Sequence, residues 1–301
     1  MNELFDKLIL RVIFTIFICL VLYSYKYLHA LFYPTTRKQI FNKFSPTKNA
    51  PDTIHLLSRI LGLGIVFSEF YFHISSGIMV AIAEFLILSV IVTILYLLSI
   101  YIVESIVLYN FEYQDEIIKR KNFSYAIISF SHCLGLGLIL KSVLFIAKDS
   151  IIMLLVVWLL AMALLGFATK SYSIVSKLSF NRLLVQKNLS VAFSYLGFFL
   201  GWSLIISFSM QQELLEIRWF SAQVILKIIL SLIIYPVFRK GIQVFYRLED
   251  KIEMSDRIDS DTGQNELVGF GIFEGILFFT SCYLTTVITS NIHFGDFYPV
   301  F

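Results

Sequence analysis

Residues 187–210 read KNLSVAFSYLGFFLGWSLIISFSM, and this stretch carries the pattern that decides the fold. After Lys187 it holds no charged residue, and it is long enough to cross the hydrocarbon core of a bilayer as a helix. Asn188 stands where its side chain can accept from the free amides of a first helical turn. Gly197 and Gly201 lie one turn apart, so they share a face on which another helix can approach closely. The stretch therefore predicts a capped, closely packed transmembrane helix.

The same pattern opens three other apolar segments. Residues 121–126 read KNFSYA, and the pairs Lys48-Asn49 and Gln264-Asn265 stand at equivalent places. The shared Asn predicts helix N-caps at Asn49, Asn122, Asn188 and Asn265. Small residues that follow predict close helix packing at Ser58, Gly62, Ser131, Gly135, Gly197, Gly201, Gly271 and Gly275. A capped helix start can serve packing alone, or it can present the positive end of the helix dipole to an anion.

The composition extends this interpretation to the whole chain. Of its 301 residues, 58% are hydrophobic and only 15% are charged, whereas a soluble domain carries about 25% charged residues. Eight segments approach the length and apolarity of a membrane span, namely 8–32, 54–74, 77–109, 123–147, 150–176, 189–210, 217–246 and 266–289. We predict an all-α integral membrane protein of about eight transmembrane helices, arranged as four parallel helix-pair repeats.

Basic residues gather on one side of these segments. The connections inside each helix pair, residues 33–53, 110–122, 177–188 and 247–265, hold most of the Lys and Arg. The opposite side, tails included, holds only Lys7, Arg11, Lys148 and Arg218. Because basic loops tend to stay in the cytoplasm, we predict that these four connections are cytoplasmic and that both termini lie outside.

Several short motifs resemble a known family. Residues 109–112 (YNFE), 115–117 (DEI) and 121–127 (KNFSYAI) follow one another, and residues 188–192 (NLSVA) repeat the last motif. They resemble the signature of the DUF350 (YjfL-like) family of bacterial membrane proteins. The resemblance covers nearly the whole chain and implies two tandem four-helix membrane units, residues 1–147 and 148–301. Ser stands where the family prefers Ala, and the last copy, residues 264–269, keeps only Asn and a small residue. The resemblance implies a bacterial inner-membrane location and no established activity, and it supplies no binding residues.

Ionisable residues also fall inside the predicted spans. Arg59 and His132 stand at the same distance from their cap Asn, and Glu274 falls beside that position. If the second helices of the pairs form an inner ring, these three residues form one polar layer, with Lys227 as a fourth member. Such a layer could conduct protons or bind a charged solute. Alternatively, a static Arg–Glu pair with the His as partner only fixes the packing. Glu104, near a helix end, is interpreted as an interfacial anchor.

Other chemistry has no support in the sequence. It lacks GxxxxGK, HExxH, CxxC and GxSxG motifs, so we predict no catalytic residues, no cofactor and no metal site. The net charge of +3 does not indicate a nucleic-acid partner. Two functions stay open. The chain could be a channel or transporter that passes a small ion or solute through the inner ring. It could also be a scaffold or accessory subunit in the lipid bilayer, whose basic loops bind anionic lipid head groups or a partner. A homo-oligomer stays open in both.

Overall fold

The computed structural model describes residues 2–42, 46–70, 77–147, 150–176, 178–214, 216–247, 261–292 and 294. Eight of its helices are long and apolar enough to cross a membrane. They are α1 (Asn2–Phe32), α3 (Ala50–Phe67), α4 (Ile78–Val107), α5 (Phe123–Ala147), α6 (Ile151–Val175), α8 (Leu189–Met210), α9 (Ile217–Phe245) and α10 (Asp261–Thr289). The connections hold the short helices α2 (Arg37–Asn42) and α7 (Phe180–Val185), a 3-10 turn (Pro34–Thr36) and a π-helical turn, η2 (Gln114–Lys119). The predicted all-α membrane class with eight spans is confirmed.

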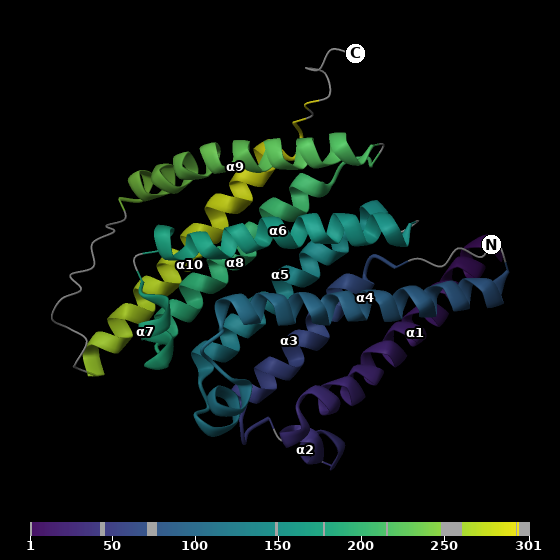
Figure 1. Ribbon diagram of the computed structural model, residues 1–301, viewed down its shortest axis with the longest axis horizontal. Coiled ribbons are helices and arrows are strands. Elements are labelled where there is room, and N and C mark those ends of the chain that lie inside the picture. The colour runs from purple at the N-terminus through teal and green to yellow at the C-terminus, as the bar shows by residue number, and fades with distance from the viewer. Residues whose placement is uncertain are drawn as a thin grey trace.

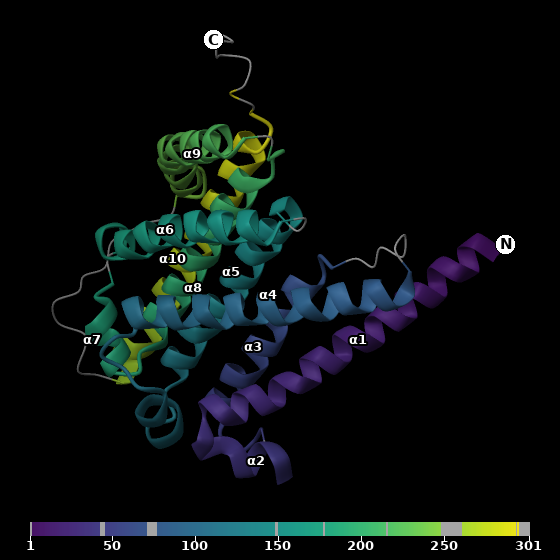
Figure 2. The ribbon, with the colours of Figure 1, turned by 45° about the vertical axis from the view of Figure 1, so that its right-hand side comes forward.

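The second helices of the four pairs lie side by side in one layer. Their order is α3, α5, α8, α10, the order of the chain (Figure 1). α4, α6 and α9 lie across this layer, each packed on two neighbouring helices of it, and α1 packs on α3 at the end of the layer (Figure 2). Over the described residues, α3 and α10 stand at opposite ends and are not packed on each other. The second helices therefore form an open row, and the predicted inner ring is wrong.

The positions of the contact residues explain why the row stays open. On α5, Gly137 lies against Gly62 of α3, whereas Gly135 lies against Phe199 of α8. Residues two apart on an α-helix point about 200° apart, so α5 contacts its two neighbours through opposite faces. α8 repeats this arrangement, because Phe199 faces α5 while Gly197 faces α10. Opposite contact faces extend a row, whereas a closed bundle of four helices needs contact faces at roughly a right angle.

The small residues predicted to allow close packing lie in these interfaces. All eight are buried, namely Ser58, Gly62, Ser131, Gly135, Gly197, Gly201, Gly271 and Gly275. The closest approach is between α8 and α10. A Cβ added to Gly197 would overlap the carbonyl oxygen of Gly275, and a Cβ added to Gly271 would overlap that of Ser190. The two backbones therefore touch directly, which is how helices associate in lipid without a hydrophobic driving force.

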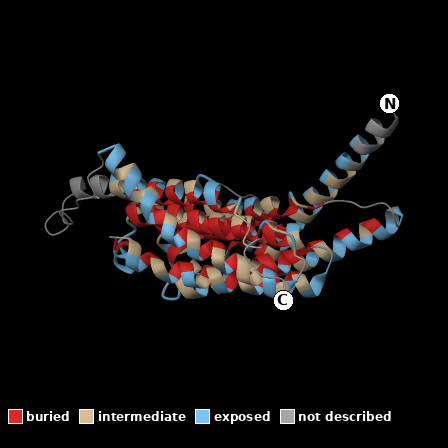
Figure 3. Cartoon of the chain, turned by 90° about the horizontal axis from the view of Figure 1, so that it is seen from above, coloured by how far each residue is buried: buried red, intermediate tan, exposed pale blue. Residues whose placement is uncertain are grey.

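Burial separates the inner helices from the outer ones. Figure 3 shows the buried residues concentrated in the middle of the molecule, away from the first half of α1. In the most apolar stretch of each second helix, 50% to 72% of the residues are buried, against 11% to 44% in the first helices. The second helices are thus the inner ones although they form no ring, and α1, at 11%, is the helix least held by the rest of the protein.

Candidate functional site

The cap Asn residues join successive repeats at one end of the molecule. α3, α5 and α8 begin at this end, beside η2 and α7, and we call it the loop end. Oδ1 of Asn49, Asn122 and Asn188 accepts in each case from an amide in the first turn of its own helix. Nδ2 of Asn49 donates to the Ile117 carbonyl oxygen at 3.0 Å, and Nδ2 of Asn122 donates to that of Leu184 at 3.1 Å. Asn49 and Asn122 therefore each tie a helix to the connection of the next repeat.

This double use explains why Asn stands there. Asn supplies both an acceptor and a donor, whereas Ser has one hydroxyl and ionised Asp can only accept. Because Oδ1 occupies first-turn amides, the geometry favours the packing interpretation over an anion site. Asn265 differs from the others, since α10 begins at Asp261 and Asn265 lies inside the helix. The predicted cap at Asn265 is therefore wrong, and its side chain lies outside the part of the chain that the structure describes.

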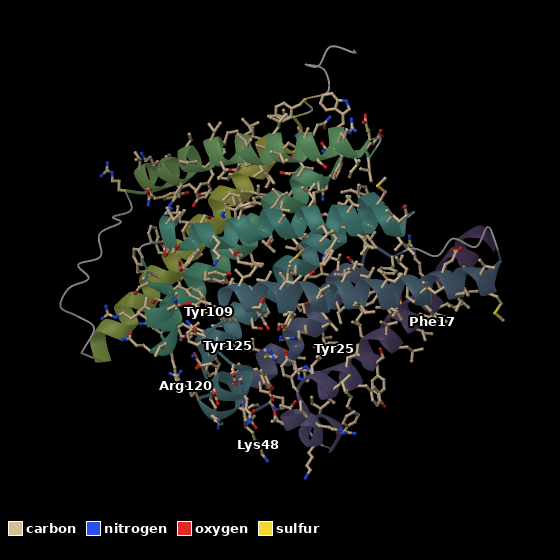
Figure 4. All side chains as sticks on the ribbon, in the orientation of Figure 1. Phe17, Tyr25, Lys48, Tyr109, Arg120 and Tyr125 are labelled. Atoms are coloured by element: carbon tan, nitrogen blue, oxygen red, sulfur yellow. The ribbon has the colours of Figure 1, made fainter. Side chains whose placement is uncertain are left out.

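Lysine side chains add a second link at the loop end. Nζ of Lys121 donates to the Lys48 carbonyl oxygen at 3.3 Å, and Nζ of Lys187 donates to that of Arg120 at 2.7 Å. Lys48 and Arg120 are labelled at this end in Figure 4. Lys121 and Lys187 have positive φ angles of 50° and 58°, a left-handed conformation that turns the chain just before the cap Asn. Part of the positive charge at the loop end is thus engaged within the protein.

The four residues of the predicted polar layer are buried but lie apart. Arg59 is on α3 and Glu274 is on α10, at opposite ends of the row. His132 Nε2 lies 3.1 Å from a tyrosine hydroxyl of α8. Lys227 Nζ donates at 3.4 Å to a backbone carbonyl just past the end of α10, away from the loop end. A single layer and a pairing of Arg59 with Glu274 are therefore wrong, because an open row separates residues that a ring would gather.

Arg59 pairs instead with Glu104 of α4. Its Nη2 lies 3.3 Å from both carboxylate oxygens and donates to the Tyr33 hydroxyl at 2.9 Å. The guanidinium carbon is 5.3 Å from the centroid of the Tyr33 ring. Ser129 of α5 donates to Glu104 Oε1 at 2.7 Å. The pair is neutral overall and hydrogen-bonded on both partners, which a buried ion pair needs to repay its desolvation.

A pocket of about 370 Å³ lies beside this pair, between α1 and α4. Its volume is typical of sites for small molecules. Arg59, Glu104 and Tyr33 are among its polar lining, and most of its walls are apolar, as at Leu97. Tyr101 also lines the pocket and is 71% exposed, so the pocket reaches the outer surface of the helices. A site of this kind can hold an apolar tail along its walls and a polar head at the ion pair.

A second polar cluster lies beside Tyr33. It consists of His29 of α1 with Asp52 and His55 of α3, and one possible ligand atom from each lies within 4.8 Å of the others. The Tyr33 ring centroid is 4.7 Å from that of His29 and 5.1 Å from that of His55. Tyr113 donates to Asp52 Oδ1 at 2.7 Å. Burial raises the pKa of the Tyr113 hydroxyl, and the hydrogen bond to Asp52 raises that pKa further, so the hydroxyl keeps its proton and stays a donor.

The interpretation of the sequence missed these three cluster residues. A signal was present, because His29 lies in the last turn of α1, and Asp52 and His55 lie in the first two turns of α3. Successive helices of a pair meet at the loop end, so residues near that end of both helices are brought together. Spacing along the sequence cannot indicate this grouping, since His29 belongs to α1 and the other two residues to α3, across a long connection.

The second half of the chain also buries a carboxylate beside a guanidinium. Glu274 accepts from Ser176 Oγ at 2.8 Å and from the Ser194 hydroxyl. Nη2 of Arg239 lies 4.0 Å from Glu274 Oε1, and the guanidinium carbon is 4.6 Å from the Phe278 ring centroid. The two Arg–Glu pairs use different helices, α3 with α4 in the first half and α9 with α10 in the second.

The two halves of the chain match one family. DUF350, described as a Domain of Unknown Function, matches residues 3–144 and again residues 146–287. The first match runs from α1 into α5 and the second from α6 into α10. This confirms the resemblance seen in the sequence and fits two tandem four-helix units. No curated protein and no solved structure matches the chain.

Proposed function

We propose, from the premise that the chain belongs to the DUF350 family through both of its halves, that it binds a small amphiphilic molecule between α1 and α4 as a step in transport. The observation that carries the proposal is a pocket of about 370 Å³ with mostly apolar walls and the Arg59–Glu104 pair among its polar lining. Lipid on the outer side would supply an amphiphile directly, because the pocket reaches the surface of the helices there.

The ion pair sets the chemistry of the head group. The Arg59 side chain is 2% exposed and that of Glu104 is 18% exposed, so the carboxylate is the more accessible partner. The N–H groups of Arg59 already donate to protein acceptors, among them the Tyr33 hydroxyl. A ligand head group therefore meets an acceptor first, and it needs a donor of its own. An amine or a hydroxyl meets this need, and an amine adds charge attraction to the hydrogen bond.

We propose that the transport path lies beside the row of inner helices and not within it. α8 and α10 touch backbone to backbone, and α5 packs on α3 through the backbones of Gly62 and Gly137. Backbone atoms cannot change rotamer as side chains do, so these interfaces leave no path between the helices. α1 makes far less contact with the rest of the protein than the inner helices do, because only 11% of its most apolar stretch is buried. A displacement of α1 from α4 would open the pocket without breaking the inner contacts. We infer that α1 is the moving part of the cycle.

Filling the pocket should abolish binding while the fold is kept. We expect Leu97→Trp to weaken binding of a fluorescent alkylamine by at least about tenfold, which is about 1.4 kcal/mol. Leu97 lines the pocket, so the larger side chain occupies the space of the ligand's tail. The matched control is Ile87→Trp, on the same helix, where the side chain is 59% exposed and does not line the pocket. Binding is measured by fluorescence anisotropy on purified protein in nanodiscs.

Equal binding by the two tryptophan variants would contradict the pocket as the site. Folded wild-type protein that binds no amine- or hydroxyl-headed amphiphile would favour the alternative function, a scaffold that holds anionic lipid through its loops. Exposed lysines at the loop end, such as Lys38 and Lys48, support that alternative. We rank it second because Lys121 and Lys187, which are exposed as well, already donate to backbone carbonyls.

The loop end is proposed to face the cytoplasm of a bacterial cell, with the chain in the inner membrane and both termini outside. The support is the excess of Lys and Arg in the connections at that end. Gln186 and Gln211 are both exposed and lie at opposite ends of the molecule. In a Cys19→Ser background, a maleimide that cannot cross the inner membrane should label Gln211→Cys in whole cells. It should label Gln186→Cys only after lysis. The reverse pattern would overturn the orientation.

A further inference from the structure

The cluster of His29, Asp52 and His55 holds polar atoms that no described residue engages. The three residues are 1%, 1% and 0% exposed. Within the described part of the chain, His29 Nε2, Asp52 Oδ2 and both ring nitrogens of His55 have no hydrogen-bond partner. Buried polar atoms in native proteins are nearly always paired, and a group of four unpaired ones in one small space needs an explanation.

We propose that this cluster binds a divalent first-row transition-metal ion, with His29 Nε2, Asp52 Oδ2 and one nitrogen of His55 as ligands. Two imidazoles and one carboxylate form a donor set that proteins use for zinc and for non-haem iron. Ca²⁺ and Mg²⁺ prefer oxygen ligands throughout, so they fit this set poorly. Three protein ligands also leave at least one position on the ion for water or another molecule. The proposal does not rest on the proposed transport function.

The candidate ligand atoms must move closer together to share one ion. Candidate ligand atoms lie within 4.8 Å of one another. Two ligand atoms at about 2.0–2.1 Å from a tetrahedral ion lie only about 3.4 Å apart. The proposal therefore requires the cluster to contract when the ion binds, chiefly through the His55 side chain, whose ring nitrogens are both unpaired. His29 comes from α1 and the other two residues from α3, so the ion would also link the loosely held first helix to the inner row.

The surrounding groups already resemble the outer shell of a metal site. His29 Nδ1 lies 3.3 Å from the Tyr25 hydroxyl, which fixes its ring and leaves Nε2 for the metal. The Tyr113 hydroxyl donates to Asp52 Oδ1 at 2.7 Å and leaves Oδ2 available. Oxygen partners of this kind orient metal ligands and are part of their affinity.

Charge is also compatible with a cation. Asp52 supplies one negative charge at the ion. Arg59, a cation beside the cluster, donates to the His55 carbonyl oxygen at 3.3 Å, and its own charge is offset by Glu104 at 3.3 Å. Removing Glu104 should therefore weaken metal binding indirectly, since it would leave the Arg59 charge unbalanced beside the ion.

The experiment uses the full chain without a histidine tag, stripped with a chelator and held in nanodiscs. The probes are Co²⁺, whose visible spectrum reports nitrogen and oxygen ligands, and Zn²⁺, whose binding is read by competition. We expect about one ion per chain and a rise in the unfolding temperature when the ion is added. His29→Gln, Asp52→Asn and His55→Gln should each weaken binding at least about tenfold and abolish the rise in unfolding temperature.

His132→Gln is the matched control. His132 is also fully buried and has one unpaired ring nitrogen, but it does not belong to the cluster. Its variant should bind metal like the wild type. Unfolding temperatures measured with chelator present identify any variant that is misfolded before metal is added. Folded wild-type protein that binds neither ion would overturn the proposal. Equal binding by the wild type and a variant that combines all three cluster substitutions would also overturn it, because the ion would then lie elsewhere.

Discussion

Replacing Arg59 by methionine is expected to lower the free energy of unfolding by about 3–5 kcal/mol, the usual effect of removing one partner of a buried ion pair. The substitution leaves the Glu104 carboxylate with the Ser129 hydroxyl as a donor but without its cation. The carboxyl group must then take up a proton or draw in water, and both are costly inside the helices. The change is measured by unfolding in mixed micelles of increasing denaturing detergent, followed by circular dichroism.

The double variant Arg59→Met/Glu104→Met separates the charge effect from lost packing. Methionine keeps much of the length of both side chains and removes both charges, and apolar replacement of a buried ion pair is often close to neutral. We expect the double variant to recover most of the stability that Arg59→Met loses. Glu84→Met is the control on the same helix, since Glu84 is exposed and its loss should change stability by less than about 0.5 kcal/mol. A double variant as unstable as the single one would mean that Arg59 acts through packing alone.

The helix spans could be predicted from the sequence because their determinants are local. Segments predicted at 123–147 and 189–210 coincide with α5 and α8, where a cap Asn precedes an uninterrupted apolar run. The span predicted from residue 54 starts later than α3, which begins at Ala50. Pro51 lies in the first turn of the helix, a position that tolerates proline. α10 begins at Asp261, so Asn265 lies inside the helix and not at its start.

The arrangement of the helices could not be predicted in the same way. One stripe of small residues per helix suggests a ring, and the row becomes evident only when both contact faces of α5 are known. The same limit applies to the site. Glu104 stands near a helix end, where its side chain is long enough either to extend to the membrane surface or to pair with a residue inside the protein. Its position in the sequence therefore does not distinguish the two. Arg59 has Glu104 and not Glu274 as its partner because α4, and not α10, packs on α3.

Replacing Gly197 by alanine is expected to lower the free energy of unfolding by about 3 kcal/mol, at the upper end of the usual cost of overpacking. The added methyl group would overlap the backbone carbonyl of Gly275, which cannot turn aside as a side chain can. α8 and α10 must then separate along their whole interface, and the contacts of Gly201 with Cys282 are loosened as well. The same unfolding assay in mixed micelles measures this loss.

Gly166→Ala in α6 provides the matched control, because no heavy atom of the described residues outside its own helix lies within 4 Å of the added Cβ. Alanine is the better helix former by about 1 kcal/mol, so this variant should be as stable as the wild type or slightly more stable. The two substitutions are chemically identical and differ only in what the methyl group meets. If Gly197→Ala were as stable as Gly166→Ala, α8 and α10 would not touch through their backbones. The open row, and with it the placement of the transport path beside α1, would then have to be abandoned.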